Sequence, residues 1–236
     1  MYPLPNTNSG KTFNNYIVNR NIIDNTAQWD GRLDWNISQK DQTFFRMSYN
    51  NEPSSHPGPL GPILDGGGFG DSGTFVNKGE NFAFSETHIF SPSLTNEARF
   101  GYNYGHFAFL EPNANVNVAA SLGLGGIPFE PLNGGLPNTN IGGISSYGSI
   151  YNTPGDEHEN VYQILDNVTK VKGQHAIKGG VSFQRVRFST FQPTWPKGTL
   201  SYNGTYTGKP GVSFTGSGVA DYLTDNQNSA TLSTIS

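Results

Sequence analysis

Residues 29–37 read WDGRLDWNI, and along this stretch apolar side chains alternate with charged or amide side chains. One face of an extended chain would carry Trp29, Leu33, Trp35 and Ile37, and the other face Asp30, Arg32, Asp34 and Asn36. A period of two residues is typical of a β-strand with one polar and one apolar face. The sequence therefore predicts a strand over 29–37.

A second alternating stretch, 42–50, follows after a short polar segment and predicts a hairpin with 29–37. The apolar faces of the two strands lie on the same side of the hairpin only if the two residue numbers of each cross-strand pair add to an even sum. That parity implies a loop of three or five residues. It also predicts that Asp34 lies opposite Arg46, an oppositely charged pair on the polar face.

A second hairpin is predicted from 81–90 and 95–107, with its turn at 91–94. If Phe90 pairs with Thr95, the polar face carries the pairs Glu86–Arg99 and His88–Glu97. The same pairing places Phe82, Phe84 and Phe90 on the polar face, so the alternation of the first arm is imperfect.

A third hairpin is predicted from 160–171 and 175–188 around a turn at 172–174. In its second arm Ile177, Val181 and Phe183 alternate with polar residues, whereas the first arm leaves both face assignments open. A short strand over 199–207, a helical piece over 218–223 and the opening of a further strand at 229–236 complete the chain.

The predicted connections alternate in length. Those at 38–41, 91–94 and 172–174 are short, and those at 51–76, 108–158 and from 189 onward are long. Residues 51–76 are so rich in Pro and Gly that we expect neither strand nor helix there. Short periplasmic turns and long extracellular loops are typical of outer-membrane barrels. The sequence thus predicts an all-β fold, an antiparallel transmembrane β-barrel fragment of six to eight meander strands.

In such a barrel the apolar faces meet lipid and the polar faces line the lumen. We expect Trp29, Trp35, Tyr49 and Tyr104 in the interfacial aromatic girdles. We expect Asp34, Arg46, Glu86 and Arg99 in the lumen.

The composition excludes several classes of protein. Hydrophobic residues make up 34% of the 236 residues and aromatic residues 13%, with a net charge of -4 and no cysteine. Disordered chains are normally poor in aromatic residues, and a nucleic-acid-binding surface needs a basic patch that is absent from this sequence. Without cysteine there is neither a disulfide framework nor a thiolate site.

Five segments resemble the barrel region of TonB-dependent receptors, specifically the Oar-like group common in Acidobacteria. They are DGRLDWNIS (30–38), FFRMSY (44–49), IFSPSLTNEARFGY (89–102), DNVTKVKGQHAIKGG (166–180) and GSGVADYL (216–223). These matches follow the family order from about residue 20 to 225.

The resemblance implies an outer-membrane receptor with a barrel of about 22 strands and an N-terminal plug. Such a receptor takes up a scarce ligand with energy from the TonB complex. The start MYPLPN has no basic and no apolar leader region. We therefore expect residues 1–236 to be a partial barrel domain that lacks the signal peptide, the plug and the C-terminal strands.

The expected partners are outer-membrane lipid, the TonB complex through the missing plug, and an unknown small ligand or oligomer, with no nucleic acid. We expect no cofactor and no enzymatic activity, because no catalytic constellation stands out. The expected location is the bacterial outer membrane.

Three local motifs have the composition of possible sites. Residues 68–73 match GxGxxG but lack the strand before and the helix after that a dinucleotide site needs, so a loop is expected. Asp156, Glu157, His158 and Glu159 could bind a divalent cation, although a solvated charge run is the simpler interpretation. His88 beside Glu97 is expected to be a hydrogen-bonded pair. No catalytic, cofactor or metal residue is assigned, and the substrate-binding residues are unknown.

Two other classes of protein are compatible with parts of this pattern. A secreted β-sandwich that binds carbohydrate would turn the aromatic face inward and present other Trp and Tyr residues to sugar. A soluble β-rich hydrolase has less support. The direction of the aromatic face separates a barrel from a sandwich.

Overall fold

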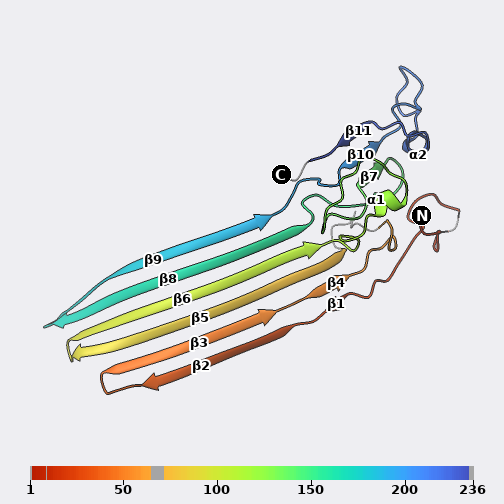
Figure 1. Cartoon of the computed structure of the whole chain (residues 1–236). Coiled ribbons are helices and arrows are strands. Elements are labelled where there is room, and N and C mark those ends of the chain that lie inside the picture. Colours follow the sequence, from red (N-terminus) through yellow and green to blue (C-terminus); the bar gives the residue numbers. More distant parts are fainter. Residues whose placement is uncertain (1, 9, 65–71, 234–236) are drawn as a thin grey trace.

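The computed structural model describes residues 2–8, 10–64 and 72–233, and one antiparallel sheet dominates it (Figure 1). Its long strands are β2 (Ala27–Asn36), β3 (Asp41–Asn51), β5 (Gly73–Ser91), β6 (Leu94–Leu110), β8 (Gly155–Lys172) and β9 (His175–Phe191). Each of them pairs with the next in chain order. Two short strands, β1 (Ile23–Asp24) and β4 (Ser54–His56), join the sheet beside β5. This meander confirms the predicted all-β antiparallel fold.

The connections alternate as predicted. The short turns 37–40, 92–93 and 173–174 lie at one end of the sheet, and the long connections lie at the other end (Figure 1). We call these two ends the turn end and the loop end.

The prediction that 51–76 holds no strand is wrong, because β4 and the start of β5 fall within it. Strand β4 fits between Pro53 and Pro57, so none of its residues lacks a backbone N–H. The long strands also exceed their predicted lengths, and β5 has 19 residues. At about 3.3 Å per residue such a strand spans roughly 60 Å, whereas the hydrocarbon core of a bilayer is about 30 Å thick.

The first hairpin has the predicted parity but not the predicted charge pair. Arg46 lies opposite Arg32, and Asp34 lies opposite Phe44. The turn explains why the observed pairing is shifted by two residues from the predicted one. The Ser38 hydroxyl accepts hydrogen bonds from the backbone N–H groups of Lys40 and Asp41 at 3.0 and 3.1 Å, which closes a compact turn after Asn36.

The second hairpin contains a β-bulge at Phe90, so the predicted pairing of Phe90 with Thr95 is wrong. Ile89 pairs with Thr95 and Ser91 with Leu94, which leaves Phe90 as the extra residue. One extra residue moves all the others to the opposite face relative to the partner strand. Phe82 and Phe84 therefore share the face of Tyr102 and Phe100.

The bulge also overturns both predicted polar pairs of this hairpin. Glu86 lies opposite Ala98 rather than Arg99, and His88 lies opposite Asn96 rather than Glu97. Glu86 is consequently on the same face as Phe84, not on the face predicted for the lumen.

In the third hairpin the second arm has the predicted alternation. The pairing also decides which residues of the first arm lie on which face. Ile164 lies opposite Phe183, while Leu165 lies opposite Ser182. Tyr162 and Ile164 therefore belong to the face of Phe183.

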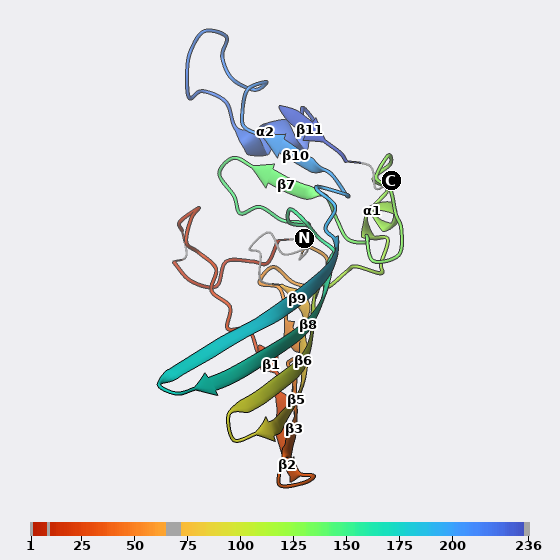
Figure 2. The same cartoon turned by 90° about the vertical axis from the view of Figure 1, so that its left-hand side faces the viewer.

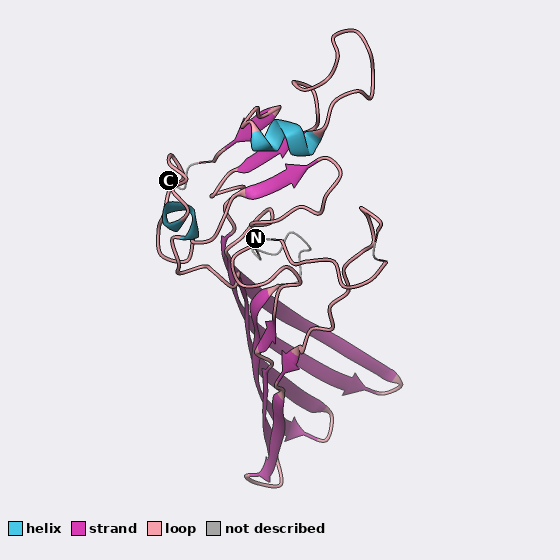
Figure 3. Cartoon of the chain, turned by 90° about the vertical axis from the view of Figure 1, so that its right-hand side faces the viewer, coloured by secondary structure: helices cyan, strands magenta, loops and turns pink. Residues whose placement is uncertain are grey.

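The long connections fold together at the loop end into a second small unit, which Figures 2 and 3 show beyond the end of the long sheet. We call residues 111–154 and 192–233 the loop cap. It contains a sheet with the order β11 (Ser229–Thr231), β10 (Thr199–Tyr202), β7 (Asn138–Ile141), and the helices α1 (Val118–Ser121) and α2 (Gly218–Leu223). The predicted strand over 199–207 thus ends at Tyr202, the predicted helix is confirmed, and the strand at 229–236 is confirmed over Ser229–Thr231, with 234–236 outside the described residues.

The apolar core lies in the loop cap, joined by Leu64 from the connection between β4 and β5, and not under the long sheet. The core residues are Leu64, Val118, Ala119, Leu136, Ile141, Tyr147 and Tyr202. Every residue of β2 and of β9 is exposed. In the described ranges β2 pairs only with β3, and β9 only with β8, so the long sheet is open at both sides. Neither described helix has the length and apolar character needed to cross a membrane.

Candidate functional site

One face of the long sheet carries a continuous row of apolar side chains. Direct cross-strand partners point to the same side of a sheet, and the pairing aligns one residue per long strand: Leu33, Phe45, Phe84, Phe100, Ile164 and Phe183. All six are exposed, from 43% for Phe100 to 64% for Leu33. We call this side the aromatic face. A contiguous apolar patch of this kind marks contact with lipid or another apolar partner.

Toward the loop end the aromatic face becomes amphipathic. Trp29, Tyr49 and Tyr104 lie in one row, and the rings of Trp29 and Tyr49 stack at 5.7 Å. Rings of this type favour the boundary between lipid and water. Trp35, the fourth residue predicted for a girdle, lies on the turn side of the apolar row, opposite Thr43. The aromatic border of the apolar row is therefore at the loop end, whereas on the turn side Trp35 shares its row with Glu86 and Asp166.

The opposite side of the sheet, which we call the polar face, gathers charged and amide side chains. The pairing places Arg46 and Arg99 on this side together with Asp34. The ion pairs run mainly along a strand: Arg32 contacts Asp34 at 2.7 Å, and Arg99 contacts Glu97. Residues two apart on a strand share a face, so these pairs need no particular cross-strand register.

A buried ion pair holds the loop cap together. Glu111 follows β6 directly, and its carboxylate accepts hydrogen bonds from Ser149 Oγ at 2.6 Å, Ile150 N at 3.0 Å and Lys197 Nζ. Both charged side chains are 1% exposed. Burial lowers the pKa of Lys197, and the carboxylate of Glu111 opposes that effect. The pair joins the connection after β6 to the connection after β9.

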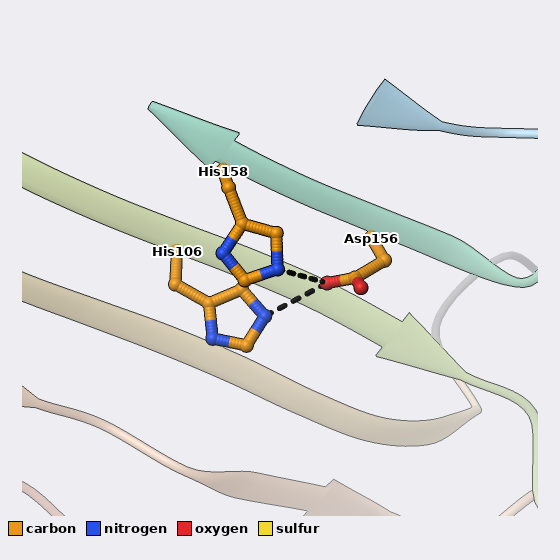
Figure 4. A group of neighbouring side chains, drawn as sticks. All are labelled: His106, Asp156 and His158. Atoms are coloured by element: carbon orange, nitrogen blue, oxygen red, sulfur yellow. Dashed lines mark hydrogen bonds and ion pairs between the residues drawn. The ribbon is translucent and has the colours of Figure 1, made fainter. Parts of the chain in front are cut away.

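The acidic run at 156–159 is divided between two faces because it lies in β8. Asp156 and His158 belong to the aromatic face, beyond the aromatic row, while Glu157 and Glu159 point to the other side. His106 of β6 lies directly opposite His158. Its Nε2 is 2.8 Å from Asp156 Oδ1, and Nε2 of His158 is 3.3 Å from the same oxygen (Figure 4).

The two imidazole rings of this cluster stack with centroids 4.1 Å apart and planes 10° apart. One ligand atom from each of His106, Asp156 and His158 lies within 4.8 Å of the others. Sequence reasoning found Asp156 and His158 but missed His106, because the pairing of β6 with β8 spans the long connection 111–154. The cluster could hold a cation.

The remaining motifs have simpler roles. His88 contacts Asp41 of β3, and Glu97 contacts Arg99, so the predicted His88–Glu97 pair does not form. Residues 68–71 of the GxGxxG match lie outside the described residues, and Gly73 begins a strand rather than a helix.

A cleft of about 1200 Å³ lies between the N-terminal segment and the loop cap. Its walls combine apolar and amide side chains from residues 12–18 with Leu60 and residues 143–145. On one side Tyr2 donates a hydrogen bond to Ser145 O at 2.5 Å. The cleft is open, and Arg20 is the one charged residue among the described residues that line it.

The profile of the family described as "Outer membrane beta barrel domain" matches residues 1–236. No curated protein and no solved structure matches the chain significantly. The match covers the entire chain and agrees with the two-faced meander and its exposed apolar row. The chain belongs to the outer membrane β-barrel domain family and lies in the bacterial outer membrane.

Proposed function

We propose that this chain forms part of the barrel wall of a TonB-dependent receptor of the Oar-like kind, which takes up a ligand across the outer membrane. The observation that carries the proposal is the six-residue apolar row, backed by a charged polar face. A wall with lipid on one side and a polar lumen on the other has this pattern.

The loop end supports uptake rather than passive diffusion. The long connections fold into a packed cap with a cleft, instead of leaving the end of the sheet open to solvent. A cap of this kind can collect a ligand before it enters the lumen. We place the TonB contact in a plug region of the intact protein, and the ligand in the class of small molecules or oligomers.

The proposal includes no enzymatic step. A secreted β-sandwich is disfavoured, because a sandwich would bury the aromatic face that is exposed here.

The test is to express the intact protein that carries this chain, extract it from the outer membrane with detergent and insert it into a planar bilayer. A plugged receptor gives no steady conductance, and it binds the purified periplasmic domain of TonB. The alternative is a passive pore. A steady open-channel conductance together with no binding to TonB would replace the receptor with that alternative. Recovery of the protein in the soluble fraction would refute both.

A further inference from the structure

We propose that His106, Asp156 and His158 form a binding site for a divalent transition metal ion of the Zn²⁺ class on the outer surface of the barrel wall. The proposal rests on side-chain geometry at the loop end of β6 and β8 and does not depend on the transported ligand.

The backbone brings these three residues together. His106 and His158 are direct cross-strand partners, and Asp156 lies two residues before His158 on the same face. Direct partners have Cβ atoms only about 4.5–5.5 Å apart. The site therefore follows from the pairing of two long strands and needs no loop to hold it in place.

The distances match a tetrahedral ion. A zinc ion bound at about 2.0–2.1 Å holds its ligand atoms about 3.3 Å apart. Asp156 Oδ1 is 2.8 Å from Nε2 of His106 and 3.3 Å from Nε2 of His158. Figure 4 shows both rings directed at the carboxylate from neighbouring strands. An ion would replace the two N–H···O contacts, and the stacked rings, now 10° from parallel, would turn so that both Nε2 lone pairs converge on it.

A further residue orients one of the ligands. The hydroxyl group of Tyr104 lies 3.0 Å from Nδ1 of His158. When Nδ1 donates its proton to this hydroxyl oxygen, Nε2 carries the lone pair that a metal needs. Tyr104 is thus a positioning residue and not a ligand.

The donors select the class of metal. Two imidazole nitrogens and one carboxylate suit Zn²⁺, Ni²⁺ or Cu²⁺, whereas Mg²⁺ and Ca²⁺ prefer oxygen ligands. The side chains of His106, His158 and Asp156 are 23%, 38% and 48% exposed, so an ion has access and a water molecule can take the fourth position. Lys78 lies opposite His106 and would repel a cation, but its ammonium group is paired with Glu80 at 2.7 Å.

The experiment is a titration of the intact protein, purified in detergent without a polyhistidine tag, with Zn²⁺ by isothermal calorimetry. We expect one Zn²⁺ to bind at this site and an excess of Mg²⁺ not to compete. His106→Gln, His158→Gln and Asp156→Asn should each weaken binding by more than about tenfold. Tyr104→Phe should weaken it by about tenfold, the lower end of the range for outer-shell partners.

His88→Gln is the matched control, because His88 also contacts an aspartate on the aromatic face but has no second histidine in its cluster. Its affinity should equal that of the wild type. Heat-dependent gel mobility verifies that each variant is folded. The absorption of Co²⁺ bound to the wild type gives an independent readout if a variant fails to assemble: a tetrahedral spectrum supports the site, and an octahedral aquo spectrum opposes it. Absence of Zn²⁺ binding to the wild type, or unchanged binding by the His106→Gln/His158→Gln double variant, overturns the proposal.

Discussion

The stability of the loop cap depends strongly on two single residues, the buried ion pair Glu111–Lys197. Removing one partner of a buried ion pair typically costs about 3–5 kcal/mol, because the other charge stays buried without compensation. We predict that Lys197→Met lowers the unfolding free energy of the loop cap by about 3 kcal/mol. The lower end applies because Ser149 Oγ and Ile150 N still donate to Glu111. Urea unfolding followed by the fluorescence of Trp195 measures the change.

Lys209→Met is the control for this prediction, since Lys209 is an exposed lysine in the same loop cap. Its effect should stay within about 0.5 kcal/mol. The double variant Glu111→Gln/Lys197→Met should lose less stability than the two single variants together. Equal effects of Lys197→Met and Lys209→Met would show that the buried pair does not stabilise the cap.

The sequence pattern identifies site residues that lie close together along one strand, but not those that are distant in the sequence. Asp156 and His158 are two positions apart, and the alternation of a strand is enough to place them on one face. His106 completes their cluster only through the pairing of β6 with β8. Glu111 and Lys197 are 86 positions apart, and no local pattern connects them.

At the scale of a strand, the bulge at Phe90 decides which side chains of β5 meet lipid. The chain has no native cysteine, so single cysteines report on one position at a time. We predict that Phe84→Cys and Glu86→Cys react poorly with a water-soluble maleimide in intact membranes, because both lie on the aromatic face. Ser85→Cys and Thr87→Cys should react readily from the polar face.

Without the bulge, Glu86 would lie on the polar face, opposite Arg99. Rapid labelling of Glu86→Cys together with slow labelling of Thr87→Cys would therefore show that Phe90 is paired and the bulge absent. Labelling in detergent, where all four positions should react, controls for intrinsic reactivity.

Helices and strands with a clear local sequence pattern could be predicted, but the residues at which they begin and end were predicted less well. Helix α2 matches its predicted range, and the side chain of Ser217 caps it by accepting a hydrogen bond from Ala220 N at 3.3 Å. The strands β5, β6 and β8 run further than predicted toward the loop end, where the polar and apolar residues no longer alternate cleanly. Backbone pairing with neighbouring strands, rather than side-chain pattern, extends them.

Across the whole molecule, the alternation of loop lengths was enough to predict which strand ends lie together. It could not predict the loop cap, because the core of the cap joins Leu64, Val118, Leu136 and Tyr202 from three separate connections. Packing between distant loops leaves no period in the sequence. The apolar residues of the aromatic face, in contrast, can be recognised from the alternation within each strand. They form a continuous band across the sheet only because the bulge at Phe90 aligns β5 with its neighbours.

The continuity of that band sets the last prediction. Phe100 lies near the middle of the apolar row, flanked by Phe84 and Ile164 on the neighbouring strands. A charged side chain that faces lipid near the bilayer midplane costs about 2–4 kcal/mol. Phe100→Arg should therefore lower the unfolding free energy of the intact protein in lipid vesicles by about that amount. Gln163→Arg, one residue before Ile164 and on the polar face, should have little effect, since its charge would meet the lumen. If Gln163→Arg proved the more damaging of the two, the faces would be reversed, and the aromatic row would point inward as it does in a sandwich.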